Sequence, residues 1–174
     1  MSKIVILRGN AGSGKSTVAK SLHRKLGRGT LLISQDCIRD MLLVSDEPEN
    51  QAIELIENII IYGSQKCDFI ILEGILYEEI YRRLFRRIEE LFSSQIFAYY
   101  FDLPFEETLK RHKQRRRITP SLHVFGEIEM SKWWRHKDRL NNICEKTLNK
   151  DMSLDEIVEL IYSDLQLDNT GRMG

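Results

Sequence analysis

Gly9-Asn10-Ala11-Gly12-Ser13-Gly14-Lys15-Ser16-Thr17 is the stretch of this sequence that decides its fold. It matches G-x-x-x-x-G-K-[ST], the Walker A pattern of phosphate-binding loops. Apolar residues before it predict a short buried strand over residues 3–8, and apolar residues at helical spacing after it predict a helix that ends near Gly27. The motif requires this strand–loop–helix context, so we expect a polyphosphate site here.

The residue types of this phosphate loop suit a nucleotide triphosphate. Its glycines let the backbone turn closely around phosphate groups, and the following helix directs N–H groups and a positive dipole end toward their oxygens. Lys15 would bring a positive charge to the β- and γ-phosphates, and the Ser16 hydroxyl would be a ligand of Mg²⁺. We therefore expect the whole loop, from Gly9 to Thr17, to bind ATP with Mg²⁺.

Length and composition limit the class of protein. A chain of 174 residues is most simply one domain, which we expect to span residues 1–168 with a flexible tail over 169–174. Its 26 basic and 26 acidic residues cancel, so no overall charge attracts nucleic acid or an anionic membrane. Three widely spaced cysteines, with no leader and no long apolar run, indicate a cytoplasmic protein without disulfides or a membrane span.

Strands and helices alternate along the rest of the chain. Short apolar runs predict four more strands, over residues 30–34, 68–72, 96–102 and 143–148. Apolar stripes at helical spacing predict helices over residues 49–64, 77–92, 104–117 and 127–140, and a last one from a capping box at Ser153 onward. This alternation predicts the α/β class, with a parallel five-stranded sheet sandwiched by helices.

Ligands of such sheets bind beyond the carboxyl ends of the strands. That rule places the phosphate loop in one cleft with Asp36, Arg39, Glu73 and Asp102, which follow the other strands. The sequence lacks the base-reading N-K-x-D motif of GTPases, and its third strand ends in Glu-Gly rather than the Asp-Glu pair of water-activating ATPases. The cleft residues therefore favour phosphoryl transfer to an acceptor.

Asp36 is the candidate catalytic base. A carboxylate opposite the phosphate loop can accept the proton of an attacking hydroxyl while the bond to the γ-phosphoryl group forms. Arg39, three residues later, would lie on the same face of a helix and hold a polar or anionic part of the acceptor. In a purely structural interpretation, Asp36 would instead cap a helix that starts at Cys37.

Glu73 is the second candidate carboxylate of the cleft. It would organise Mg²⁺ through water or bind a hydroxyl of the acceptor, so we count it as a substrate-binding residue. The alternative is an exposed acid at the end of a strand.

A dense basic run follows the fourth strand. Phosphoryl transfer needs several positive charges on the transferred group. Arg111 and Arg115 are our catalytic candidates, and Arg117 is a candidate contact to ATP. We expect a lid over about residues 111–128, while a merely solvated face would have the same composition.

These features resemble the small P-loop kinases, a group that includes zeta-toxin-like kinases, chloramphenicol phosphotransferase, gluconate kinase and the kinase half of polynucleotide 5′-kinases. The resemblance rests on the phosphate loop, on Asp36-x-x-Arg39 and on the order of the elements. It implies a P-loop NTPase fold, nucleoside-monophosphate-kinase-like, with a basic helical lid, Asp36 as base, and Arg39 in contact with acceptor or phosphate. Glu73-Gly74 departs from the Asp-bearing ending in some of these families, so the acceptor does not carry over.

We therefore expect an ATP-dependent kinase, a phosphotransferase that acts on a hydroxyl of a small-molecule acceptor. A 5′-hydroxyl polynucleotide or nucleoside/nucleotide kinase is an alternative, favoured by the Asp36-x-x-Arg39 match and by the basic lid. Neutral net charge disfavours a long nucleic-acid track. A second alternative is a nucleotide-gated regulatory module without an acceptor. The sequence does not select the acceptor, ATP over GTP, or an oligomeric state.

Overall fold

The computed structural model describes residues 2–118 and 126–170, with the backbone alone at 115–118 and 168–170. Its strands are β1 (Lys3–Gly9), β2 (Thr30–Ser34), β3 (Phe69–Gly74), β4 (Ile96–Phe101) and β5 (Glu145–Leu148). Its helices are α1 (Lys15–Leu26), α2 (Gln35–Leu42), α3 (Gln51–Lys66), α4 (Glu78–Phe92), α5 (Phe105–Ile118), α6 (Glu127–Trp133) and α7 (Leu154–Thr170).

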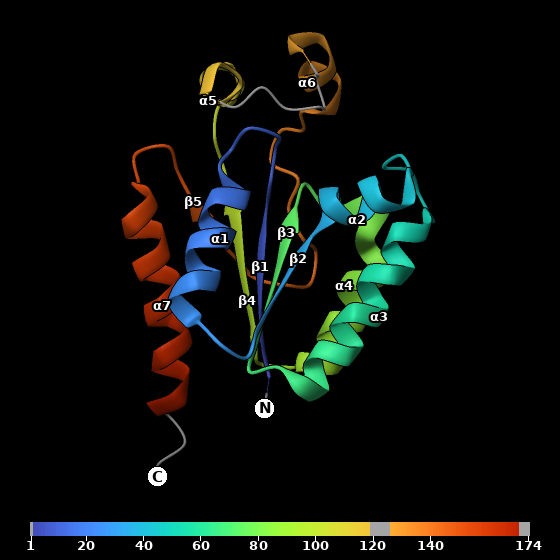
Figure 1. The fold of residues 1–174 in the computed structure, drawn as a ribbon, viewed down its shortest axis with the longest axis vertical. Helices are drawn as coiled ribbons and strands as arrows, with labels where there is room; N and C mark the ends of the chain where they lie inside the picture. The colour runs from blue at the N-terminus through green and yellow to red at the C-terminus, as the bar shows by residue number, and fades with distance from the viewer. Residues whose placement is uncertain (1, 119–125, 171–174) are drawn as a thin grey trace.

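The five strands form one sheet in the order β2-β3-β1-β4-β5, and every neighbouring pair is parallel. This confirms the predicted α/β fold. The first strand lies in the middle, where Val5 is level with Ile71 of β3 and with Phe97 of β4. The phosphate loop therefore leaves the sheet at its centre, between the ends of its two neighbours (Figure 1).

Helices cover both faces of the sheet. Ile4 and Ile6 of β1 face a core that α3 and α4 complete, whereas Val5 and Leu7 face a core built with α1 and α7. Figure 1 shows α1 and α7 on one side of the sheet and α2, α3 and α4 on the other. Because each central strand is buried on both faces, its sequence is continuously apolar and does not alternate.

Helix α2 differs from the structural interpretation of Asp36. The helix starts at Gln35, directly after β2, so Asp36 lies in the first helical turn and does not cap the helix. The N-cap residue is Ser34, which forms no side-chain cap hydrogen bond. An acidic residue in the first turn still favours the helix through its dipole.

Helix α6 ends at Trp133, so the prediction of a helix to Leu140 is wrong. The physical reason is a competing hydrogen bond, because the backbone N–H of Arg135 donates to the side-chain oxygen of Asn10 at 2.8 Å. Helices α5 and α6 stand beyond the carboxyl ends of the strands (Figure 1). Lys113 and Glu127 join them by an ion pair of 3.1 Å. Residues 119–125 of the predicted lid lie outside the described residues.

Helix α7 begins as predicted from its capping box. The Ser153 hydroxyl and the Glu156 carboxylate hydrogen-bond to each other and to each other's backbone N–H. The helix continues to Thr170 and so includes the first two residues of the segment predicted as a tail, while 171–174 lie outside the described residues. No helix in the described ranges has both the length and the apolar composition needed to cross a membrane.

Candidate active site

The backbone of the phosphate loop is shaped by close contact with α5. Gly12 has a φ of +78°, and a Cβ at this position would lie 2.6 Å from the carbonyl oxygen of Thr108. Both the backbone conformation and the lack of space therefore demand glycine. The N-terminal part of helix α5 thus rests directly on the phosphate loop.

Lys15 is buried and spans the phosphate loop from within. Its ammonium group donates to the carbonyl oxygen of Asn10 at 2.8 Å and contacts the hydroxyl oxygen of Ser13 at 3.3 Å. These contacts hold the positive charge at the turn of the loop. A phosphate bound there would meet a cation that is already positioned.

A cleft of about 460 Å³ lies over the loop. Residues 11–17 line it together with Asp36, Ile75 and Arg111, which come from three other parts of the chain. Met152, Leu154 and Ile157 add apolar surface that suits a nucleotide base. The structure thus brings the phosphate loop, Asp36 and Arg111 around one space.

Arg39 lies between two carboxylates of different exposure. Its Nη1 atom is 3.8 Å from Asp36 and 3.9 Å from Asp46. The Asp36 side chain is 68 % exposed, so its carboxylate is accessible to a substrate, whereas that of Asp46 is 13 % exposed. Tyr81 donates to Asp46 at 2.8 Å, and burial raises the pKa of that carboxyl group above its usual value. The arrangement fixes Arg39 while leaving Asp36 open.

Glu73 lies at the end of β3, directly beside the phosphate loop. The hydroxyl of Ser16 donates to its Oε2 atom at 3.0 Å, and Glu73 is only 4 % exposed. The alternative of an exposed acid at a strand end is therefore wrong.

Ser16 and Glu73 also fit a magnesium ion. Mg²⁺ prefers oxygen ligands and is usually held by one or two protein groups, phosphate oxygens and water. Within residues 2–118 and 126–170, no cluster of three His, Cys, Asp or Glu side chains could hold an ion by itself. These two oxygen-bearing side chains are thus suited to an ion that arrives with a nucleotide.

The remaining predicted residues lie at different places. Arg111 donates from Nη1 to the carbonyl oxygen of Ser13 at 3.3 Å, so its guanidinium contacts the phosphate loop. Arg115 and Arg117 belong to α5, but their side chains lie outside the described residues. Asp102 does not line the cleft, and its carboxylate is 3.7 Å from Arg139.

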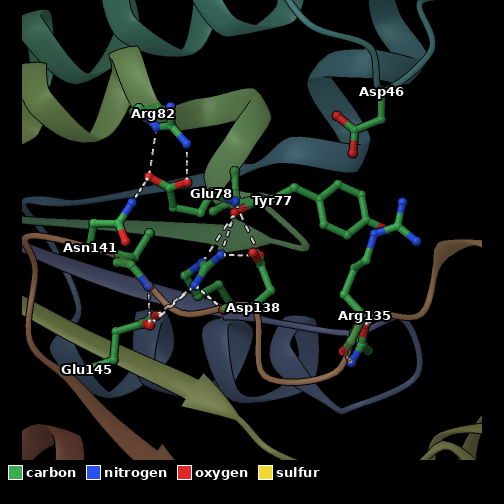
Figure 2. Close-up of polar contacts among 12 residues, drawn as sticks. Asp46, Tyr77, Glu78, Arg82, Arg135, Asp138, Asn141 and Glu145 are labelled. Carbon is green, nitrogen blue, oxygen red and sulfur yellow. Dashed lines mark hydrogen bonds and ion pairs between the residues drawn. The ribbon is translucent and has the colours of Figure 1, made fainter.

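A contact between the phosphate loop and the segment after α6 was missed in the sequence analysis. The Asn10 side-chain amide donates to the carbonyl oxygen of Arg135 at 2.8 Å and accepts from its N–H at the same distance. The guanidinium of Arg135 lies 5.4 Å from the ring centre of Tyr77 (Figure 2). An asparagine within the loop was the available signal, because its amide can donate and accept together.

A buried ion cluster lies just behind the loop. Arg8 is fully buried and donates to Leu76 O at 2.9 Å, to the Asp138 carboxylate at 2.5 Å and to Glu145 at 3.1 Å. Figure 2 shows Asp138 and Glu145 turned toward the same point. An arginine within an apolar strand is a sequence signal for such a cluster, since a buried charge needs partners. The cluster joins the chain around residues 76 and 138–145 to the end of β1, directly before the phosphate loop.

Comparison with known proteins now places the chain. A model of the AAA domain family matches residues 4–140. The chain belongs to this family. The residues of this chain that the family model matches include the phosphate loop, Asp36, Arg39 and Glu73. Its sequence matches no curated protein.

The AAA domain shares its fold with solved kinases. A gluconokinase from Sinorhizobium meliloti 1021 has a TM-score of 0.65 and 15 % identity, covering 94 % of this chain and 91 % of that chain. The APS kinase of Mycobacterium tuberculosis, in complex with AMPPNP and APS, has a TM-score of 0.64 and 22 % identity. This match covers 95 % of this chain and 98 % of that chain. The tunicamycin resistance protein of Deinococcus radiodurans has a TM-score of 0.61 and 19 % identity, and the match covers 95 % of this chain and 96 % of that chain. The AAA domain thus has a P-loop kinase-like fold, as the resemblance implied.

Proposed function

We propose that this protein is an ATP-dependent kinase that transfers the γ-phosphoryl group to a hydroxyl of a small-molecule acceptor. The observation that carries the proposal is the shared cleft, in which an exposed carboxylate, Asp36, faces the same space as the phosphate loop. The kinase-like fold supports the proposal. A hydrolase would instead need a residue that activates water.

The chain's own residues divide the work of the transfer. Lys15 and Arg111 bind phosphate oxygens and stabilise the charge that spreads over them in the transition state. Asp36 accepts the proton of the attacking hydroxyl, and Arg39, 3.8 Å away, orients that carboxylate. Ser16 and Glu73 would hold Mg²⁺, which when bound neutralises charge on the phosphates.

The decisive test is transfer of labelled γ-phosphate from Mg·ATP to a panel of sugars, sugar acids, nucleosides, antibiotic alcohols and 5′-hydroxyl oligonucleotides. We expect one class to be labelled. Asp36→Asn should lower kcat about 10²- to 10⁴-fold with AMPPNP binding retained, because it removes only the base. Lys15→Ala should lose transfer together with AMPPNP affinity.

Asp40→Asn is the matched control, since it removes a carboxylate from the same helix outside the cleft. It should keep wild-type transfer. Slow ATP hydrolysis that is insensitive to Asp36→Asn would contradict the proposal and would favour a nucleotide-gated module.

A 5′-hydroxyl polynucleotide kinase is a second candidate. The observation that favours it is the Asp36–Arg39 pair on α2, which matches the pattern of that group. The same panel separates the two candidates. Labelling confined to oligonucleotides, with a steep loss of binding as salt increases, would select the polynucleotide kinase.

A further inference from the structure

Arg135 stands out among the arginines near the cleft. Four others each lie within 4 Å of a carboxylate, namely Arg8, Arg39, Arg111 and Arg139. In the part of the chain that the structure describes, Arg135 has no such partner. Its guanidinium donates to the carbonyl oxygen of Lys132 at 3.1 Å and lies against the Tyr77 ring. An exposed cation beside the cleft is thus left without an anion.

The backbone beneath this side chain is clamped from two sides. Asn10 holds both the N–H and the C=O of Arg135, at 2.8 Å each. On the other side, the Tyr77 hydroxyl donates to the carbonyl oxygen of Trp133. The segment therefore bridges the phosphate loop and the loop after β3. An arginine on so fixed a backbone is pre-organised to bind a ligand.

Arg135 lies against Tyr77, just outside the residues that line the cleft. The residues that line the cleft over the phosphate loop include Arg111 but neither Arg135 nor Tyr77. Burial raises the pKa of Tyr77 to about 12, while the charges of Arg135, Asp46, Asp138 and Arg39 also act on its hydroxyl. Figure 2 shows the Arg135 guanidinium beside the Tyr77 ring and the Asp46 carboxylate above that ring. Arg39 connects this carboxylate to Asp36, the proposed base.

The carboxylate of Asp46 already has other partners. It accepts hydrogen bonds from Gln35 and Tyr81, and Arg39 lies 3.9 Å from it. Among the residues that the structure describes, the Arg135 guanidinium donates only to the carbonyl oxygen of Lys132, which leaves its other donors open to a ligand. Its planar, forked donors suit a carboxylate, phosphate or sulfate group.

We propose that the acceptor carries an anionic group in addition to its reacting hydroxyl, and that Arg135 binds this group. Asn10 is the positioning residue that holds Arg135 over the acceptor. The proposal rests on the kinase function proposed above and names the class of its substrate. It assigns to Asn10 a task different from contact with ATP.

The test uses two pairs of probes whose members differ in one anionic group: D-gluconate with D-sorbitol, and adenosine 3′-phosphate with adenosine. Transfer of labelled γ-phosphate gives kcat/KM for each. We expect the charged member of at least one pair to be preferred about tenfold or more, the worth of one charged hydrogen bond. Arg135→Gln should bring that ratio to within about threefold through KM, and Arg135→Lys should retain part of it.

Asn10→Asp keeps the side-chain oxygen that accepts from the Arg135 N–H but loses the N–H group that donates to the Arg135 carbonyl. It should therefore lower the preference for the charged probe over its uncharged partner. Arg86→Gln, an equal charge change on the exposed face of α4, is the control and should keep the wild-type ratio. A ratio that Arg135→Gln leaves unchanged would overturn the proposal. Equal losses for both members would also overturn it, because they would place Arg135 on the transferred phosphoryl group.

A binding measurement separates this proposal from the proposed function. Each probe is titrated calorimetrically into protein saturated with Mg·AMPPNP. If no probe is phosphorylated but a charged member binds in an Arg135-dependent way, the kinase reaction on these acceptors fails and the anion site stands. If neither charged probe binds more tightly than its uncharged partner, the anion site is wrong.

Discussion

Gly12 and Gly27 have nearly the same φ, +78° and +76°, in different surroundings. A Cβ at Gly12 would meet the carbonyl oxygen of Thr108 at 2.6 Å, whereas one at Gly27 would meet nothing within 4 Å. Both Ala variants should lose about 1–3 kcal/mol of unfolding free energy to backbone strain. Gly12→Ala should lose about 1–3 kcal/mol more by overpacking and should also weaken AMPPNP binding. Urea unfolding and calorimetry of both variants would measure this, and equal losses would contradict it.

At the scale of residues, local chemistry was predictable and distant partners were not. The phosphate loop and the position of Asp36 follow from short patterns beside strand ends. Asn10 and Arg135 are separated by 125 positions, so their contact exists only after the sheet and the helices α5 and α6 have assembled. The same holds for Arg8 and Asp138, which are 130 positions apart. A pattern that spans a few residues can indicate that Asn10 or Arg8 needs a partner, but it does not identify the partner.

At the scale of elements, the Arg8 cluster joins β1, β5 and the loop after β3. Glu145 is 2 % exposed, so Arg8→Met would leave a buried carboxylate without its cation. We expect a loss of about 3–5 kcal/mol of unfolding free energy, and partial recovery in the double variant Arg8→Met with Glu145→Gln. Urea unfolding of the single and double variants would measure both effects.

The matched control for the Arg8 cluster is an ion pair on the surface of α4. Arg87 and Glu90 are 2.7 Å apart, with side chains 40 % and 63 % exposed, and Glu57 of α3 lies 3.8 Å from the same arginine. Because water screens such a pair, Arg87→Met should change the unfolding free energy by less than about 1 kcal/mol. A loss as large as that of Arg8→Met, or a double variant no more stable than the single one, would show that burial of the charges does not matter.

Most element types followed from apolar periodicity, and the errors concern ends. The sequence pattern of α6 continues past Trp133, but the N–H of Arg135, two residues later, donates to Asn10 and the helix stops. The start of α2 at Gln35 was also missed, because nothing in the local pattern separates the end of β2 from the first helical turn. Tertiary hydrogen bonds and immediate strand-to-helix junctions decide such ends.

At the scale of the whole molecule, buried tyrosines limit stability in alkali. Burial is the main cause that raises the pKa of Tyr77, Tyr81 and Tyr99 above the value of 10 in the unfolded chain. Above pH 10, the unfolded state therefore binds fewer protons than the native state, and unfolding free energy falls as pH rises. The slope should approach about 1.4 kcal/mol per pH unit for each tyrosine.

Urea unfolding at pH 9, 10 and 11 would measure this slope, and Tyr99→Phe should reduce it by about one tyrosine. The variant also loses the hydrogen bond from Tyr99 to Asp164, at 2.6 Å in the wild type. Loss of this hydrogen bond already lowers the unfolding free energy at pH 9. It therefore does not account for a change in how steeply the unfolding free energy falls with pH. A Tyr99→Phe variant with the wild-type slope would show that other groups cause the alkaline loss.

The central position of β1 in the sheet also determines when, during synthesis, the sheet around the phosphate loop can form. The strand leaves the ribosome first, yet its two neighbours begin at residues 69 and 96. At about 5–20 residues per second, it waits several seconds before either flank can form. A nascent chain that ends before about residue 100 thus has a Walker A sequence without the two strands that flank β1. A nucleotide can therefore stabilise the chain only after both flanking strands have been made, and the earlier intermediates must persist without help from such a ligand.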